Sequence, residues 1–141
     1  MSTDYTTLNT LAATLWGEAR GEGLTGLLAV ACVISNRANK PGWWGTDIRS
    51  VCTKPWQFSC WNPNDPNRPH LESLVREPPV RGQNPVWDKC IMAAQAVFLE
   101  GLPDITNGAN HYCTKAVANR TAWAKGQKPV AILGNHQFYR L

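Results

Sequence analysis

The sequence lacks several patterns that mark large classes of proteins. No run of five or more basic residues occurs, although Lys and Arg outnumber Asp and Glu by 14 to 10. The net charge of +4 favours approach to an acidic polymer, but no basic stripe or known nucleic-acid motif is present, so we do not expect nucleic acid as a partner. No stretch approaches the length of a membrane span, and no internal repeat is visible. The 141 residues therefore predict one domain, residues 1–141, with no integral membrane segment.

The N-terminus lacks the features of a secretory signal peptide. It has neither the basic n-region nor the apolar h-region of such a peptide. We therefore expect synthesis in the cytoplasm, and any target outside it would be reached only after release by another factor. The sequence also lacks a coiled-coil signal, so a monomer is the simplest expectation.

The five cysteines include no Cys-x-x-Cys pair. This argues against a disulfide framework and against a structural zinc site of the usual spacing. Cys32 and Cys90 lie within helical apolar patterns and are expected to be small core residues. Cys52 and Cys60 flank a short segment and would be able to pair if oxidised. We expect no metal and no cofactor.

Tryptophan, by contrast, is abundant, with seven copies. Aromatic faces stack on sugar rings and on nucleobases. Together with long loops, this excess suggests a ring-shaped or polymeric ligand, although several of the tryptophans are expected to belong to the core.

Apolar residues at intervals of three and four predict the main helices. The first helix has Asp4 or Thr6 as its cap and ends within residues 17–21. The second covers residues 24–37 and is apolar over most of its circumference, so it should be the buried central helix. A third begins with Asn84 as its cap and runs to residue 100.

Between the second and third helices the sequence predicts a short helix over residues 47–52, with Thr46 as its cap. Residues 53–84 are dominated by Pro, Asn, Asp and Trp. A stretch of this length is expected to be a functional loop, ordered by three buried aromatic residues, Trp56, Phe58 and Trp61.

The last forty residues carry glycines, isolated aromatic residues and a short apolar run over residues 130–133. This composition favours short strands or a hairpin over a helix. The predicted fold class is therefore α+β and mainly helical, with a small β region beside a cleft.

The segment Gly17-Glu18-Ala19-Arg20-Gly21-Glu22 places two carboxylates where the first helix ends. Continued by three, the apolar stripe of that helix reaches Glu18, so this carboxylate lies at the edge of the core. Desolvation should raise its pKa toward the range of a general acid. The alternative is that Glu18 is a solvated cap or ion-pair partner. The members of the stripe are Leu8, Leu11, Ala12 and Leu15.

Three further segments place polar groups beside aromatic residues, at residues 57–59 (Gln-Phe-Ser), 108–112 (Gly-Ala-Asn-His-Tyr) and 134–139 (Gly-Asn-His-Gln-Phe-Tyr). Together with residues 17–22, and with Asn-Arg at 36–37, they resemble the SleB-type cell wall hydrolases, the family of spore-cortex-lytic enzymes and phage endolysins. The resemblance runs from about residue 8 to the C-terminus.

The resemblance implies a lysozyme-like fold, of the goose-type or lytic transglycosylase kind. It also implies cleavage of peptidoglycan glycan strands between N-acetylmuramic acid and N-acetylglucosamine, with Glu18 at the position of the family's catalytic glutamate. Peptidoglycan is then the expected partner. The lack of a signal peptide favours a phage endolysin that acts on the cell wall after release.

Other residues receive roles that the sequence leaves open. Tyr112 would hydrogen-bond a sugar or Glu18, or be a buried tyrosine with a satisfied hydroxyl. His111, like His136, would assist protonation, although a structural role is more common. The remaining candidates would bind substrate or serve the protein's own structure, by fastening loops or filling the core: Gln57, Phe58, Ser59, Asn110 and Trp123.

Glu18 would protonate the glycosidic oxygen, and two routes diverge from there. A lysozyme uses water, normally with a second carboxylate, whereas a lytic transglycosylase uses the sugar's own 6-hydroxyl. Glu22 is the nearest second carboxylate, but Gly21 interrupts the helix between them. Glu22 is thus either a base or a residue that positions Arg20 or the next helix, and a mechanism with one glutamate is favoured.

Two rival functions remain at this stage. A zinc amidase or endopeptidase would use His70, His111, His136 and Cys113, whose spacing fits no known zinc motif. A non-catalytic glycan-binding module would account for the tryptophans but needs no buried acid.

Overall fold

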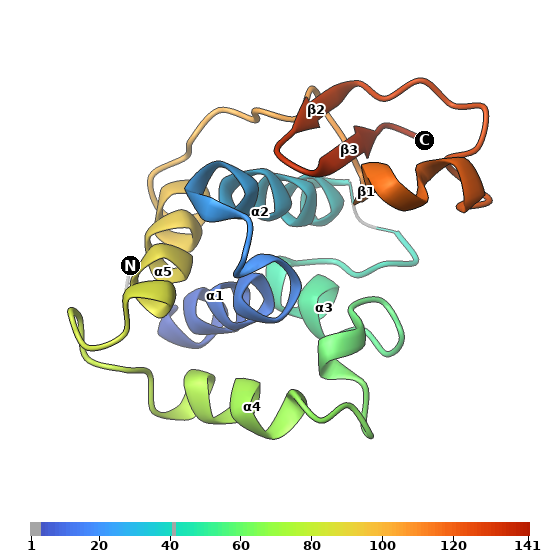
Figure 1. The fold of residues 1–141 in the computed structure, drawn as a ribbon. Coiled ribbons are helices and arrows are strands. Elements are labelled where there is room, and N and C mark those ends of the chain that lie inside the picture. The colour runs from blue at the N-terminus through green and yellow to red at the C-terminus, as the bar shows by residue number, and fades with distance from the viewer. Residues whose placement is uncertain (1–3, 41) are drawn as a thin grey trace.

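The described part of the computed structural model comprises residues 4–40 and 42–141, in which helices precede a small sheet. This order confirms the mainly helical α+β class (Figure 1). The elements are α1 (Tyr5–Ala19), α2 (Gly23–Asn39), α3 (Ile48–Thr53), η1 (Ser59–Trp61), α4 (Arg68–Arg76), α5 (Pro85–Phe98), β1 (His111–Thr114), η2 (Lys115–Arg120), β2 (Ala131–Leu133) and β3 (His136–Tyr139).

Side-chain caps fix where the two long outer helices begin. At α1 the Asp4 carboxylate accepts a hydrogen bond from the Thr7 backbone N–H at 3.0 Å, so Asp4, and not Thr6, is the cap. At α5 the Asn84 side chain accepts from the Trp87 N–H at 3.0 Å, and Pro85 is the first helical residue. The predicted start of the third helix is therefore confirmed.

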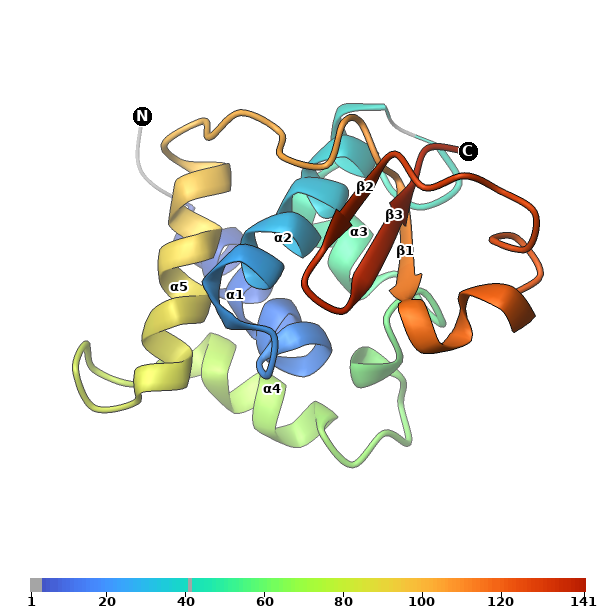
Figure 2. The same cartoon turned by 45° about the horizontal axis from the view of Figure 1, so that its top comes forward.

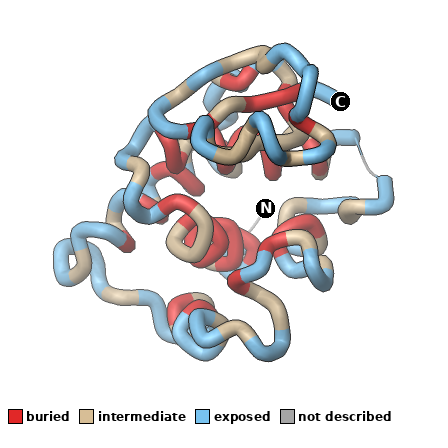
Figure 3. Tube along the Cα trace, turned by 45° about the vertical axis from the view of Figure 1, so that its right-hand side comes forward, coloured by how far each residue is buried: buried red, intermediate tan, exposed pale blue. Residues whose placement is uncertain are grey.

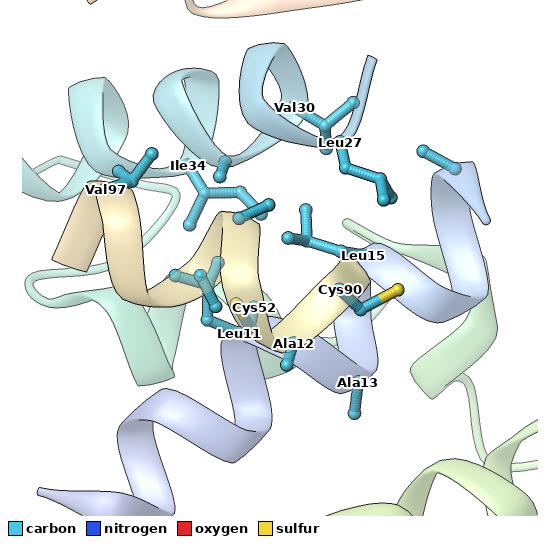
Figure 4. Packing of buried hydrophobic residues seen from close by; sticks show 14 of the residues in the cluster. Leu11, Ala12, Ala13, Leu15, Leu27, Val30, Ile34, Cys52, Cys90 and Val97 are labelled. Atoms are coloured by element: carbon cyan, nitrogen blue, oxygen red, sulfur yellow. The ribbon is translucent and has the colours of Figure 1, made fainter. Parts of the chain in front are cut away.

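The core lies where α1, α2 and α5 meet, since α5 packs against both other helices. Their apolar stripes face one another (Figure 4), and the same segments form the buried stretches of the chain in Figure 3. Cys32 and Cys90 belong to this buried set, as expected. Each fully buried leucine or isoleucine of this core contributes roughly 1.5–3 kcal/mol to the free energy of unfolding.

Helix α2 is the central helix that its sequence predicts. One side packs on α1 and α5, and the other side carries Ala29 and Val33, which contact Ala109 and Phe138 of the sheet region. Figure 2 shows the sheet lying alongside α2. A helix buried on two sides needs apolar residues around most of its circumference, which is what the sequence supplies.

The sheet is antiparallel with the order β1-β3-β2, so β3 is its central strand. Tyr112 of β1 lies opposite Phe138 of β3, and Leu133 of β2 lies opposite His136. Gly134, with φ +59, and Asn135 form the two-residue turn between β2 and β3. The hairpin expected from the apolar run over residues 130–133 is thus confirmed.

Residues 53–84 differ from the prediction of one long loop, because they contain η1 and α4. Helix α4 buries only Leu71 and Leu74, and Pro69 near its start made its sequence resemble a loop. The preceding short helix is also capped differently, since Asp47, and not Thr46, accepts from the Ser50 N–H at 2.8 Å.

The three aromatic residues expected to order this segment do not behave alike. Phe58 is buried, and the Trp61 indole N–H donates to the Thr14 hydroxyl at 2.9 Å. Trp56 is instead 72% exposed, so the prediction that it is buried is wrong.

All five cysteines lie within the described residues and are free thiols. Cys52 and Cys60 are both buried, and the pair considered from the sequence is not formed. Within residues 4–40 and 42–141, no helix is long and apolar enough to cross a membrane.

Candidate active site

Glu18 lies in the last turn of α1, where the helix meets β1 and η1. The Tyr112 hydroxyl donates a hydrogen bond to its Oε1 at 2.8 Å, and the Cys60 thiol is a second polar group that acts on this carboxyl. Burial raises the pKa of Glu18, and it outweighs Tyr112, Cys60 and the charges of His136 and Arg37, which all act in the opposite direction. The sequence predicted a raised pKa for Glu18, and the structure agrees with this direction.

Gly17 allows η1, which carries Cys60, to pack closely against the end of α1. A Cβ added at Gly17 would lie 2.7 Å from both the Cβ and the Sγ of Cys60, and 3.3 Å from Leu71. A residue without a side chain is thus required beside Glu18, because any larger one would push Cys60 away from the carboxylate.

Tyr112 is held in place by its neighbours on β3. Its ring meets His136 edge to face at 5.3 Å and lies 5.9 Å from the ring of Phe138. Burial and the adjacent Glu18 carboxyl raise the pKa of Tyr112 well above its ordinary value, so the hydroxyl stays protonated and donates. The sequence left open whether Tyr112 bonds a sugar or Glu18, and the structure has the second arrangement.

Arg37 is a member of the site that residue-level reasoning passed over. It is buried near the end of α2, where its Nε donates to the Asn110 carbonyl at 2.8 Å. Its guanidinium stacks over Trp44 at 5.5 Å and Phe58 at 5.6 Å. Burial lowers the pKa of Arg37, while Tyr112 and Glu18 oppose this. The signal was available in the sequence, since the apolar stripe of α2 ends on Arg37 as that of α1 ends on Glu18.

Glu22 is fastened to the β2–β3 turn. Its Oε1 lies 3.2 Å from His136 Nδ1 and accepts from the Asn135 backbone N–H at 3.3 Å, while Oε2 accepts from the Asn135 amide at 3.4 Å. Arg20 is not its partner, because Arg20 donates to the Trp16 carbonyl. Of the two roles considered for Glu22, this arrangement favours positioning.

The Gln-Phe-Ser segment mainly supports its own loop. The Gln57 amide donates to the carbonyls of Val51 at 2.6 Å and Trp44 at 3.2 Å. Phe58 is only 3% exposed beneath Arg37, so its ring is not available to a ligand, whereas Ser59 is exposed. Of the two roles considered for Gln57, the structure therefore shows the one in which its side chain holds its own loop in place.

Asn110 also serves the protein itself. Its side chain donates to the Leu141 carbonyl at 2.9 Å and accepts from the Leu141 N–H at 3.0 Å. His111 Nδ1 lies 2.8 Å from Asn110 Oδ1, and its ring lies 4.9 Å from that of the half-buried Trp123. Burial and Arg37 lower the pKa of His111, which favours the neutral imidazole.

The residues of the zinc alternative do not gather. His70 packs against Trp16 at 5.4 Å, and His136 packs against Tyr112. Throughout the part of the chain that the structure describes, no three His, Cys, Asp or Glu side chains lie close enough to hold a metal ion.

The lysozyme-like fold is mainly helical with a small sheet, and a half-buried glutamic acid whose pKa is raised lies where the two meet, as a glycosidase with a general acid requires. Residues 21–139 match the family model described as Cell Wall Hydrolase, and the chain belongs to that family. The matched range begins after Glu18, so the role of that residue rests on geometry and on the sequence motif.

Two solved structures share the fold. The catalytic domain of the germination-specific lytic transglycosylase SleB from Bacillus anthracis matches with a TM-score of 0.67 and 22% identity, covering 99% of this chain and 97% of that one. The catalytic domain of the Bacillus cereus SleB protein matches with a TM-score of 0.68 and 22% identity, covering 99% and 93%. A comparison with curated proteins finds no match.

Proposed function

We propose that the protein cleaves peptidoglycan glycan strands between N-acetylmuramic acid and N-acetylglucosamine, as a lytic transglycosylase that uses Glu18 first as an acid and then as a base. The observation that carries this proposal is the 2.8 Å hydrogen bond from Tyr112 to a carboxyl whose pKa burial has raised. Burial keeps this carboxyl protonated to higher pH, and the hydrogen bond from Tyr112 fixes its orientation.

In the proposed reaction, the Glu18 proton passes to the glycosidic oxygen as the bond from that oxygen to the muramic acid anomeric carbon breaks. Positive charge develops at that carbon. The Glu18 carboxylate, stabilised by the Tyr112 hydroxyl, then takes the proton from the 6-hydroxyl of the same sugar. The 6-oxygen bonds to the anomeric carbon, which gives a 1,6-anhydro product and restores protonated Glu18.

The choice of this route over hydrolysis is supported by the position of Glu22. Its carboxylate is occupied by Asn135 and His136, so it is poorly placed to activate a water molecule. A muramidase that uses the same acid with water is the alternative. The raised pKa of Glu18 also favours catalysis over a non-catalytic glycan-binding module, which needs no buried acid.

Digestion of purified peptidoglycan by wild type and by Glu18→Gln tests the proposal, with the soluble fragments identified by mass spectrometry. We expect anhydro-muramic ends whose release falls by a factor of about 10² to 10⁴ in the variant. The control is Glu72→Gln, which removes an exposed carboxylate that lies 3.8 Å from Arg68. Reducing muramic ends would assign a muramidase. Free stem peptides, or full activity of Glu18→Gln, would contradict the proposal.

We further propose that the enzyme is a phage endolysin, made in the host cytoplasm and brought to the cell wall by a separate release factor. The support is the resemblance to a family that includes such enzymes. Bacteria that express the protein should stay intact until the inner membrane is permeabilised with chloroform and should then lyse. Lysis before permeabilisation would contradict this role.

A further inference from the structure

Two tryptophans stand out from the surface on neighbouring loops. Trp43 is 66% exposed and Trp56 is 72% exposed. The loops that carry them are joined, because the Gln57 amide donates to the Trp44 carbonyl at 3.2 Å and the Lys54 ammonium lies 5.7 Å from the centre of the Trp43 ring. Trp43 and Lys54 are thus in contact, and Trp56 lies in the same joined pair of loops.

The backbone at Trp56 is in a conformation that a tryptophan rarely adopts. The Gln57 N–H donates to the Lys54 carbonyl at 3.1 Å and closes a turn with Pro55 second and Trp56, at φ +67, third. This is the pattern of a type II turn, whose third position favours glycine. The Trp56 N–H donates to the Asn62 side chain at 3.2 Å and so fixes the turn further. The turn therefore holds an exposed indole in place at a cost in stability.

Aromatic rings connect this surface with the active site. The rings of Trp43 and Trp44 lie 5.3 Å apart, those of Trp44 and His111 lie 6.2 Å apart, and that of Trp123 follows at 4.9 Å from His111. Arg37 stacks on Trp44, and its charge acts on Glu18. Trp43 is therefore the exposed end of a row of rings that packs on Arg37, the residue whose charge acts on Glu18.

We propose that Trp43, Lys54 and Trp56 form a second binding site for the peptidoglycan strand, which takes sugar rings away from the bond that is cut. The indole faces would stack on the apolar faces of the sugars, and the Lys54 ammonium would meet a carboxylate of the muramoyl or stem-peptide groups. This inference rests on the function proposed above. It predicts that long strands bind more tightly than short fragments.

The decisive variants are Trp56→Gly and Trp43→Ala, each placed in the Glu18→Gln protein and measured for binding to insoluble peptidoglycan by sedimentation. We expect each to raise the Kd about fivefold to tenfold, since an aromatic stacking contact is worth a factor of about that size. Tyr5→Ala is the matched control, because Tyr5 is an aromatic residue with 67% exposure in the first turn of α1.

In the active enzyme, the same two substitutions should raise KM for polymeric peptidoglycan and leave cleavage of a short fragment unchanged. Unaltered Kd and KM in both variants, with normal cleavage by wild type, would overturn the second site and leave the proposed function standing. Failure of wild type to bind or cleave peptidoglycan would overturn both. A wild-type dimer that the substitutions dissociate, with no change in Kd, would assign the surface to a second copy of the chain.

The melting temperature of Trp56→Gly distinguishes a role of Trp56 in ligand binding from a role in supporting the fold. Because glycine adopts a positive φ without strain, Trp56→Gly should keep or raise the melting temperature while binding weakens. A lower melting temperature together with the lost binding would mean that Trp56 supports the fold, and would overturn the proposal.

Discussion

Glu18 and Tyr112 form a pair in which each residue changes the titration of the other. The Tyr112 hydroxyl donates to the ionised carboxylate and so opposes the rise in the Glu18 pKa that burial causes. The two influences act on the same proton, which makes the pH dependence of the enzyme a direct measure of this contact.

Tyr112→Phe should move the alkaline limb of the kcat/KM profile to higher pH. Removal of the donor destabilises the carboxylate, so the pKa of Glu18 rises further and the acid form persists to higher pH. The measurement is kcat/KM for peptidoglycan solubilisation across a pH series. Tyr139→Phe is the control, since that hydroxyl donates to Gln137 at 2.7 Å. A limb that stays in place or moves to lower pH would contradict the assignment.

Glu18→Gln should make the protein more stable at neutral pH while it lowers activity. The folded-state pKa of Glu18 lies above its ordinary value of 4.5, so the folded state binds its proton more tightly than the unfolded state does. Wild-type stability is therefore lost as pH rises from about 4.5 through the folded-state pKa, and the variant escapes this loss. Urea unfolding across that range should show a growing advantage for the variant, whereas a constant difference would refute the argument.

Among single residues, the sequence was sufficient to predict that Glu18 lies at the edge of the core, but it was insufficient to predict which residues contact Glu18. An apolar helical stripe that ends on a charged residue can be recognised in the sequence, and such stripes end on Glu18 in α1 and on Arg37 in α2. Tyr112 lies 94 residues away from Glu18 along the chain, and no local pattern predicts which of its two candidate partners it bonds. The same holds for Glu22, whose contact with Asn135 depends on how the sheet docks on the helices.

Among the elements, the packing of η1 on the end of α1 places the Cys60 thiol against Glu18. This packing depends on Gly17, where an added Cβ would lie 2.7 Å from Cys60. The surrounding contact includes Leu71 of α4, so the neighbours have little room to move.

Gly17→Ala should therefore destabilise the protein by about 1–3 kcal/mol and reduce activity, because the added methyl group forces η1 away from Glu18. Gly21→Ala, in the same short motif, is the matched control, since no atom lies within 4 Å of its added Cβ. That change should stay within about 0.5 kcal/mol of wild type. Denaturant unfolding of both variants decides the matter, and equal effects would show that Gly17 is not needed for packing.

The elements that sequence reasoning placed well are those with strong caps and continuous stripes, such as α1, α2 and α5. Helix α4 was missed because two buried leucines beside a proline leave a weak signal. Trp56 was misplaced for a related reason. An aromatic residue in a long loop usually orders that loop, whereas here a turn closed by backbone contacts points the side chain outward.

Across the whole molecule, the free thiols report on the integrity of the core. Burial raises the pKa of Cys52, Cys60 and Cys90 to about 12, so these thiols are inert at neutral pH. Cys32 is buried as well, while Cys113 is half-buried on β1.

Alkylation of the native protein at pH 8, read by mass spectrometry, should modify Cys113 first and the other four only after unfolding. In the unfolded protein all five should react, which serves as the internal control. Rapid modification of Cys60 in the native state, or a Cys52–Cys60 disulfide in the untreated protein, would contradict the buried arrangement of these thiols.

The strand order β1-β3-β2 has a consequence for when the active site is assembled. The central strand comes later in the chain than both of its neighbours, so β1 has no sheet to join until β3 has been synthesised. Tyr112 lies on β1, and its ring rests on Phe138 and His136 of β3. A nascent chain that has already formed α1 therefore carries its acid without the hydroxyl that orients it. The contact between Glu18 and Tyr112 should therefore form only once β3 has been added, late in the synthesis of the chain.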